Sequence, residues 1–385
     1  MKERQDVSFR IGPIRPPSEA SSLLLQVTRG CTWNRCKFCQ LYRHTQFKAY
    51  SADSIKADID NMVVLAERVN AHKDENGDWD IESLNFELGT IESDDERQSF
   101  YMMANWLING GKNVFLQDGN TTVLKGGRLS DVLRYLKSAF PQIERITSYG
   151  RAENLSKTTA EEFAELKEAG LDRIHSGFET GSDAVLKLVN KGVTQEQEII
   201  AGRNVKAGGI ELSIYFMAGL GGHDLTKDNA EGTAYVINQV NPDFVRVRTA
   251  AYKPGTEIFD DWQAGRIVPC TDEEKLLEIR RIIELAEGVE SVIVSDHILN
   301  LLQDIEGRMV ADKDRLLAIC DEYLNLPKEK KLEFQLARRL GMVMRPSQMD
   351  FLGAGNKQHV QLMLREYENE RQWEDRINMI IERYI

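Results

Sequence analysis

Short apolar runs alternate with longer amphipathic stretches over the first two thirds of the chain. Such alternation is typical of parallel strands that are joined by crossover helices. The apolar runs predict six strands, at residues 23–28, 113–117, 145–149, 173–178, 211–217 and 244–249. We therefore expect an α/β fold in this part of the chain.

The helices between these strands are indicated mainly by their ends. Ser51 precedes a stretch in which apolar residues recur at helical spacing. Thr159 and Glu162 match a capping box, which predicts the start of another helix. A further β-type run at 83–88 precedes a helix predicted at 96–107, and we expect this run to form an extra edge strand.

The strand pattern fades after Pro254 and Gly255. Helical periodicity then recurs at residues 272–287, 313–324, 328–340 and 358–385. The chain is thus expected to have three regions, namely an N-terminal segment at 1–22, a core at 23–256 and a mainly helical extension at 257–385.

Composition and charge argue against a nucleic-acid-binding protein and against a membrane protein. It has 385 residues and a formal net charge of −12, and its Lys and Arg residues form no dense run. Because nucleic-acid binding needs a basic face, we expect no nucleic-acid partner. Every apolar run, the one at 23–25 included, is far shorter than the roughly 20 residues of a membrane span, and no signal region follows Met1. The expectation is a cytoplasmic protein with no membrane partner.

Three of the five cysteines, Cys31, Cys36 and Cys39, fall within nine positions directly after the first predicted strand. Such crowding in a chain without a signal sequence points to metal ligation or redox work instead of a disulfide framework. A cubane cluster held by three thiolates keeps one iron open to an outside ligand, and an open iron is a chemical site. Two alternatives stay open. One is a zinc-stabilised binding module whose fourth ligand is His44, and the other is an iron-sulfur electron-transfer or sensor protein.

The other two cysteines are Cys270 and Cys320, which lie far apart in the helical extension. Cys320 falls in line with apolar residues of an amphipathic helix, where a cysteine behaves as a small hydrophobe. We expect both to be ordinary residues, with no second cluster and no covalent role in catalysis.

The loop from Gly30 to Cys39 resembles the cluster-binding loop of the radical S-adenosylmethionine superfamily, including an aromatic residue, Phe38, before the last cysteine. Its spacing is C-x4-C-x2-C, whereas C-x3-C-x2-C is commonest in that family. Similar loops occur in uncharacterised members related to anaerobic coproporphyrinogen oxidases. The resemblance covers about residues 23–256. It implies an incomplete (β/α)6 TIM-like barrel with a C-terminal helical extension, and two cofactors, a 4Fe-4S cluster on the three cysteines and S-adenosylmethionine.

The same resemblance implies that later strand ends contribute to the S-adenosylmethionine site. After the second strand, Asp118, Gly119 and Asn120 stand in the place of the family's Gly-Gly-Glu motif, which meets the methionine amino group. After the third strand, the Ser148 hydroxyl suits a ribose and the Arg151 guanidinium suits a carboxylate.

The fourth and fifth strands end in further candidates for cofactor binding. The segment 176–182 resembles the family's Gly-x-Glu-Ser-Gly-Ser motif, so Glu179 should accept hydrogen bonds from vicinal hydroxyls. Lys191 stands where many members place a basic residue against the methionine carboxylate, and Met217 could flank the adenine.

The function that the resemblance implies is an anaerobic oxidoreductase-like enzyme. It would cleave S-adenosylmethionine at the cluster to give a 5′-deoxyadenosyl radical, which would abstract a hydrogen atom from a small-molecule substrate. A flavodoxin or ferredoxin would supply the electron.

Overall fold

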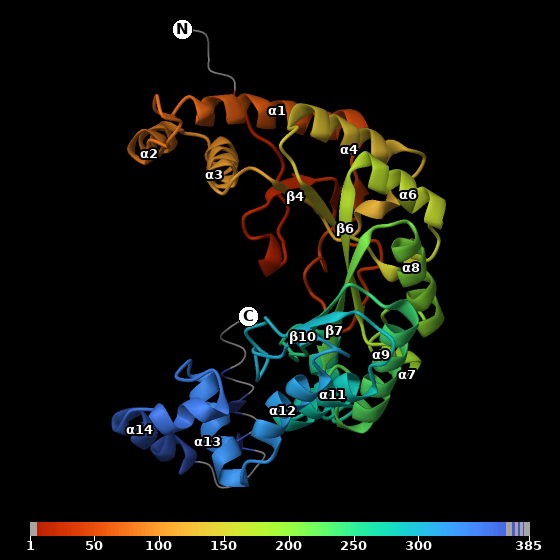
Figure 1. Ribbon diagram of the computed structural model, residues 1–385, viewed down its shortest axis with the longest axis vertical. Coiled ribbons are helices and arrows are strands. Elements are labelled where there is room, and N and C mark those ends of the chain that lie inside the picture. Colours follow the sequence, from red (N-terminus) through yellow and green to blue (C-terminus); the bar gives the residue numbers. More distant parts are fainter. Residues whose placement is uncertain (1–5, 367–371, 374–375, 378–379, 381–385) are drawn as a thin grey trace. The chain divides into compact units, whose positions relative to one another are not determined.

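The computed structural model describes residues 6–366, 372–373, 376–377 and 380. The chain forms two compact units, each with its own strands and helices (Figure 1). The first comprises residues 1–34, 44–176 and 204–211, and the second comprises residues 35–43, 177–203 and 212–385.

Parallel strands form the sheet of the first unit, in the order β1-β4-β5-β6. They are β1 (Leu23–Gln26), β4 (Asn113–Gln117), β5 (Arg145–Tyr149) and β6 (Leu171–Glu179), and the last crosses into the second unit after Ser176. The main helices of this unit are α1 (Ala52–Asn70), α2 (Ile81–Thr90), α3 (Asp94–Ile108), α4 (Arg128–Ala139) and α6 (Ala160–Ala169). Helix α4 packs against α1 and α6 (Figure 1).

The second unit also has parallel strands, in the order β7-β8-β9, with β10 antiparallel to β9 at the edge. These are β7 (Glu211–Ala218), β8 (Phe244–Thr249), β9 (Val292–Val294) and β10 (Glu306–Arg308). Its helices are α7 (Asp183–Leu188), α8 (Gln195–Ala207), α9 (Thr226–Val240), α10 (Glu257–Gln263), α11 (Asp272–Leu285), α12 (Lys313–Leu324), α13 (Lys328–Arg339) and α14 (Ala354–Leu364).

The α/β class and the six predicted strands are confirmed, and so are the helix ends that the sequence indicated. The Ser51 side chain accepts a hydrogen bond from the Ser54 amide at the start of α1. Thr159 and Glu162 form both halves of the predicted capping box of α6. The apolar stripe of α1 faces the core, where Ile55, Ile59 and Met62 have no exposed surface. These ends form as predicted because their hydrogen bonds are local to a few residues.

One prediction about secondary structure is wrong. The run 83–88 lies inside helix α2, because Asp80 caps this helix by accepting from the Ser83 amide, and the alternating Phe86 is 76% exposed instead of packed on a sheet. The extension after Gly255 is mainly helical, as predicted, and its two short strands, β9 and β10, extend the sheet. Of the helix predicted at 358–385, the structure describes the beginning as part of α14, and most of the remainder lies outside the described residues.

None of the helices formed by the described residues is long and apolar enough to cross a lipid bilayer.

Candidate functional site

The second half of the cysteine loop is anchored within the second unit by backbone hydrogen bonds. The Lys37 amide donates to the Val189 carbonyl over 2.9 Å, and the Ile258 amide donates to the Lys37 carbonyl over 3.1 Å. The Lys37 ammonium also pairs with Asp261 at 2.7 Å, with both side chains less than a third exposed. Residue 37, between Cys36 and Cys39, is therefore held on both sides of its backbone.

The three loop cysteines are half-buried and form no disulfide. The Arg43 guanidinium donates to the Cys39 carbonyl over 3.1 Å and to the Cys36 carbonyl over 3.5 Å, so it holds the backbone at these two cysteines. Cysteine side chains are the usual ligands of an iron-sulfur cluster, so the donor set fits such a cluster in chemistry. In the described part of the chain, no three or more His, Cys, Asp or Glu side chains are placed so as to hold a metal ion.

Glu179 and Lys191 form an ion pair in the second unit, with 3.1 Å between Oε1 and Nζ. Both side chains are nearly buried, at 13% and 11% exposure. Glu179 has a φ of 69°, which for a residue with a Cβ costs of order 1 kcal/mol or more. A Cβ on Gly177 would come within 2.2 Å of Glu179 Oε1, so only glycine at 177 leaves room for this carboxylate. Strain of this kind concentrates at functional sites.

Phe38, which stands between Cys36 and Cys39, contacts Lys191 of this ion pair. The Lys191 ammonium lies 5.7 Å from the centroid of the Phe38 ring, within the range of a cation–π contact. Phe38 and Met217 both pack against one apolar cluster of the second unit. The cluster consists of Val185, Val189, Leu220, Ala250, Tyr252, Ile258 and Ile267. Lys191 thus contacts the cysteine loop at Phe38, Glu179 is joined to it through Lys191, and Met217 shares an apolar cluster with Phe38.

In the first unit, the turn after β4 meets the first half of the cysteine loop. The Asp118 carboxylate is fully buried and accepts from the Gly30 amide over 3.2 Å. The Asn120 amide group donates to the Thr32 hydroxyl over 3.1 Å, and its oxygen accepts from the Arg151 amide over 3.3 Å. Gly119 is half-buried between Asp118 and Asn120. The structure therefore brings the turn that contains Asp118, Gly119 and Asn120 against the residues on both sides of Cys31.

Ser148 and Arg151 lie at the end of β5 in different surroundings. The Ser148 side chain is fully buried, and its hydroxyl bonds to Thr121 and to the Tyr149 carbonyl. The Arg151 guanidinium lies 5.6 Å from the centroid of the Trp33 ring, so it stacks on the cysteine loop. Contact of Ser148 with a ribose and of Arg151 with a carboxylate stay predictions.

Sequence reasoning missed Glu198 on helix α8. Its carboxyl group is fully buried, and neither oxygen has a hydrogen-bond partner among the described residues. Burial raises the pKa of Glu198 well above its usual value, against the opposing attraction of Lys191. The sequence could have predicted the burial of Glu198, because Glu198 lies on the same face of the helix as the buried Ala201 and Val205.

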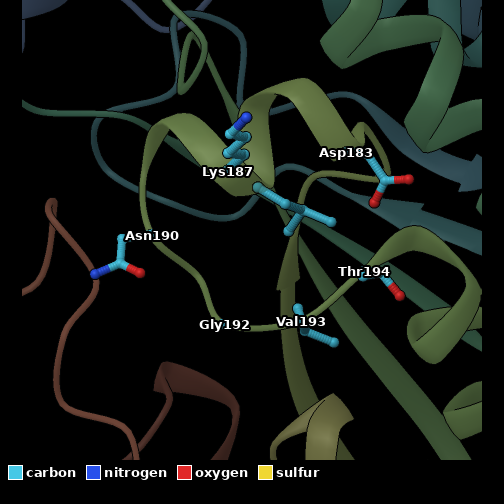
Figure 2. Close-up of a pocket in the computed structure, with 7 residues that line it drawn as sticks. Asp183, Lys187, Asn190, Gly192, Val193 and Thr194 are labelled. Carbon is cyan, nitrogen blue, oxygen red and sulfur yellow. The ribbon is translucent and has the colours of Figure 1, made fainter.

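A cavity of 370 Å³ lies over the connection between α7 and α8 (Figure 2). Its lining residues are Asp183, Leu186, Lys187, Asn190, Gly192, Val193 and Thr194. None of the residues predicted to bind the cofactor lines this cavity. Asn190 also serves the loop, since its side-chain amide donates to the Arg35 carbonyl over 3.0 Å.

Comparison with known proteins gives a family match over more than half of the chain. The model described as the radical SAM superfamily matches residues 25–228. The tRNA uridine(34) acetyltransferase of Methanocaldococcus jannaschii is 26% identical over 129 residues, which make up 33% of this chain and 23% of that protein. The heme chaperone HemW of Bacillus subtilis is 22% identical over 188 residues, which make up 48% of this chain and 49% of that protein.

Among solved structures, coproporphyrinogen III oxidase from Escherichia coli is 16% identical, over 68% of this chain and 51% of that one, with a TM-score of 0.41. The chain spans about a quarter of the length of the first curated relative and about half of the second.

Proposed function

Because the chain belongs to the radical SAM superfamily, whose enzymes use a 4Fe-4S cluster and S-adenosylmethionine, we propose that it abstracts a hydrogen atom from a small-molecule substrate. The cofactors would supply the 5′-deoxyadenosyl radical through reductive cleavage of S-adenosylmethionine at the cluster. The observation that carries the proposal is the position of the Cys36–Cys39 segment, which is anchored beside the Glu179–Lys191 pair.

In this proposal, different residues of the chain bind the cluster and S-adenosylmethionine. Cys31, Cys36 and Cys39 would hold the cluster as thiolates, and a cluster with three protein ligands would have one iron free to bind the cofactor. The Lys191 ammonium, nearly buried, attracts the methionine carboxylate, while Glu179 keeps Lys191 in place and accepts bonds from the ribose or the amino group. Because both groups are withdrawn from water, their charges are weakly screened.

Within the first unit, Asp118 and Asn120 have a positioning role in the proposal. Their bonds to Gly30 and Thr32 fix the backbone on both sides of Cys31, which orients its thiol. Gly119, in the same turn, permits close approach of the methionine moiety to the backbone. Met217, packed against the apolar cluster, would flank the adenine with its thioether.

The electron donor and the location belong to the proposal as well. A flavodoxin or ferredoxin would deliver the electron, and the protein would act in the cytoplasm. The net charge of −12 favours a small-molecule substrate over a nucleic acid, because a polyanionic substrate would be repelled by the acidic surface as a whole.

Anaerobic reconstitution of the full chain tests this function. The wild type should bind iron and sulfide and release 5′-deoxyadenosine from S-adenosylmethionine when dithionite is added. C36A should lose the cluster, whereas C320A, which removes a fully buried cysteine of α12, should keep it and serves as the matched control. A clustered protein that never cleaves S-adenosylmethionine would instead indicate an electron-transfer or sensor protein, and a colourless protein with one zinc would indicate the binding module.

A further inference from the structure

Two arginines lie on one face of strand β8, near the carboxyl ends of the parallel strands of the second unit. Arg246 and Arg248 alternate with Val245 and Val247, which are fully buried on the opposite face. The arginine side chains are themselves only 8% and 13% exposed. Arginine is rarely buried so deeply unless its charge is paired or binds an anion.

Strand β7 contributes to the same face. Its register places Tyr215 opposite Arg246 and Met217 opposite Arg248. The Arg248 guanidinium lies 4.8 Å from the centroid of the Tyr215 ring, which holds the guanidinium plane by stacking. Since Met217 is a predicted cofactor contact, the arginines share their sheet face with the proposed S-adenosylmethionine site.

A single carboxylate bridges the two guanidinium groups. Asp296, two residues after β9, accepts from Arg246 at 2.9 Å through one oxygen and from Arg248 at 2.8 Å through the other. Among the described residues, no other carboxylate forms an ion pair with either arginine. Pairing therefore leaves one excess positive charge, in a chain whose net charge is −12. Buried charge left over in this way is costly unless an anion joins it.

The neighbouring His297 reflects this positive charge without adding to it. Burial and the charges of Arg248 and Lys253 lower the pKa of His297 to about 4, although Asp296 opposes them, so its ring is neutral. The Arg246 Nε–H and the His297 Nδ1 atom are buried and have no hydrogen-bond partner in the described part of the chain. An unused buried donor on a fixed guanidinium is a position at which an anion oxygen can bind.

We propose that Arg246 and Arg248 bind an anionic group, a carboxylate or a phosphate, of the substrate. The inference rests on the proposed radical SAM function and names its substrate class, a small molecule that carries at least one such group. Asp296 is 33% exposed and holds the guanidinium groups in place from the solvent side, while the substrate anion uses the donors that Asp296 leaves unbonded.

Titration calorimetry of the cluster-loaded full chain tests the site with inorganic phosphate and with succinate, at constant ionic strength and with saturating S-adenosylmethionine. At least one anion should bind. R248A should weaken its binding by roughly ten- to a hundred-fold, the range for a charged hydrogen bond. The fold should survive because Arg246 continues to pair with Asp296. D296N, which removes the competing carboxylate, should instead strengthen binding.

R280A is the matched control, because Arg280 pairs with Asp321 between α11 and α12, and it should leave the anion affinity unchanged. The proposal is overturned if neither anion binds, if R248A and R280A behave alike, or if D296N weakens binding. It is also overturned if R248A weakens the binding of S-adenosylmethionine itself, since the arginines would then hold the cofactor's carboxylate. Cleavage of S-adenosylmethionine is measured on the same samples. If cleavage fails while anion binding depends on Arg248, the proposed function falls and the anion site stands.

Discussion

Glu278 of helix α11 should make the free energy of unfolding depend on pH, and the substitution E278Q measures the size of this dependence. Its carboxylate Oε2 accepts from the Gly219 amide and from the Asn229 side chain, each over 2.8 Å. Oε1 has no partner among the described residues. Burial raises the pKa of Glu278 to about 8 from the usual 4.5, against these two hydrogen bonds. The Glu278 carboxyl group thus anchors the turn after β7, close to Met217, and is mostly protonated and neutral at pH 7.

The sign of the effect follows from proton binding. Between about pH 4.5 and pH 8 the folded state keeps a proton that the unfolded state releases, so stability is lost as the pH rises through this window. The slope is about 1.4 kcal/mol per pH unit, which accumulates to roughly 3 kcal/mol at pH 7 and about 5 kcal/mol above pH 8. E278Q keeps an acceptor oxygen for Gly219 and cannot ionise. It should therefore lose this pH dependence.

Urea unfolding of wild type and E278Q at each pH from 5 to 9 measures the difference. The two proteins should be similar near pH 5, and E278Q should gain stability steadily up to about pH 8. E284Q is the control on the same helix, because Arg281 lowers the pKa of the exposed Glu284, so this variant should gain nothing as the pH rises. A stability difference between E278Q and wild type that stays constant from pH 5 to 9 would refute the reasoning.

Three further predictions concern the cofactor site and the remaining cysteines. E179A should weaken S-adenosylmethionine binding by roughly ten- to a hundred-fold while iron content stays normal, and unchanged affinity by titration would remove Glu179 from the site. G177A should reproduce the loss of affinity, because its Cβ displaces the Glu179 carboxylate that pairs with Lys191; normal binding would show that the pair tolerates the shift. Burial raises the pKa of both the Cys270 and Cys320 thiols, so the double variant C270A/C320A should keep its iron and its cleavage of S-adenosylmethionine; a fall in iron of about half would instead reveal a second cluster.

The sequence predicted what depends on local pattern. The strands 113–117, 145–149 and 244–249 agree with β4, β5 and β8 to the residue, because each is a short run rich in β-branched and aromatic residues. The run 83–88 misled because its alternation of apolar and polar residues has no sheet beside it, and the Asp80 cap decided the outcome. Strands β9 and β10 have only three residues each, too few for a periodicity to appear.

In the candidate site, too, the sequence predicted the residues that belong to local motifs but not the contacts between distant segments. Motif positions placed Glu179 and Lys191, and the structure adds the ion pair that joins them. The Lys37–Asp261 bridge spans 224 positions, and no local pattern could reveal it. The two arginines of β8 can be read from the sequence, but Asp296, the carboxylate that they share, follows β9. Only the fold shows that two guanidinium groups pair with a single carboxylate.

Release of 5′-deoxyadenosine by the anaerobically reconstituted chain tests the central claim most directly. With dithionite and S-adenosylmethionine, the wild type should form 5′-deoxyadenosine and methionine in equal amounts, and C31A, C36A and C39A should each form neither. C270A should match the wild type, since its buried thiol lies outside the cluster loop. Cleavage that persists in any loop variant, or a wild type that carries a cluster and releases no 5′-deoxyadenosine, would contradict the account.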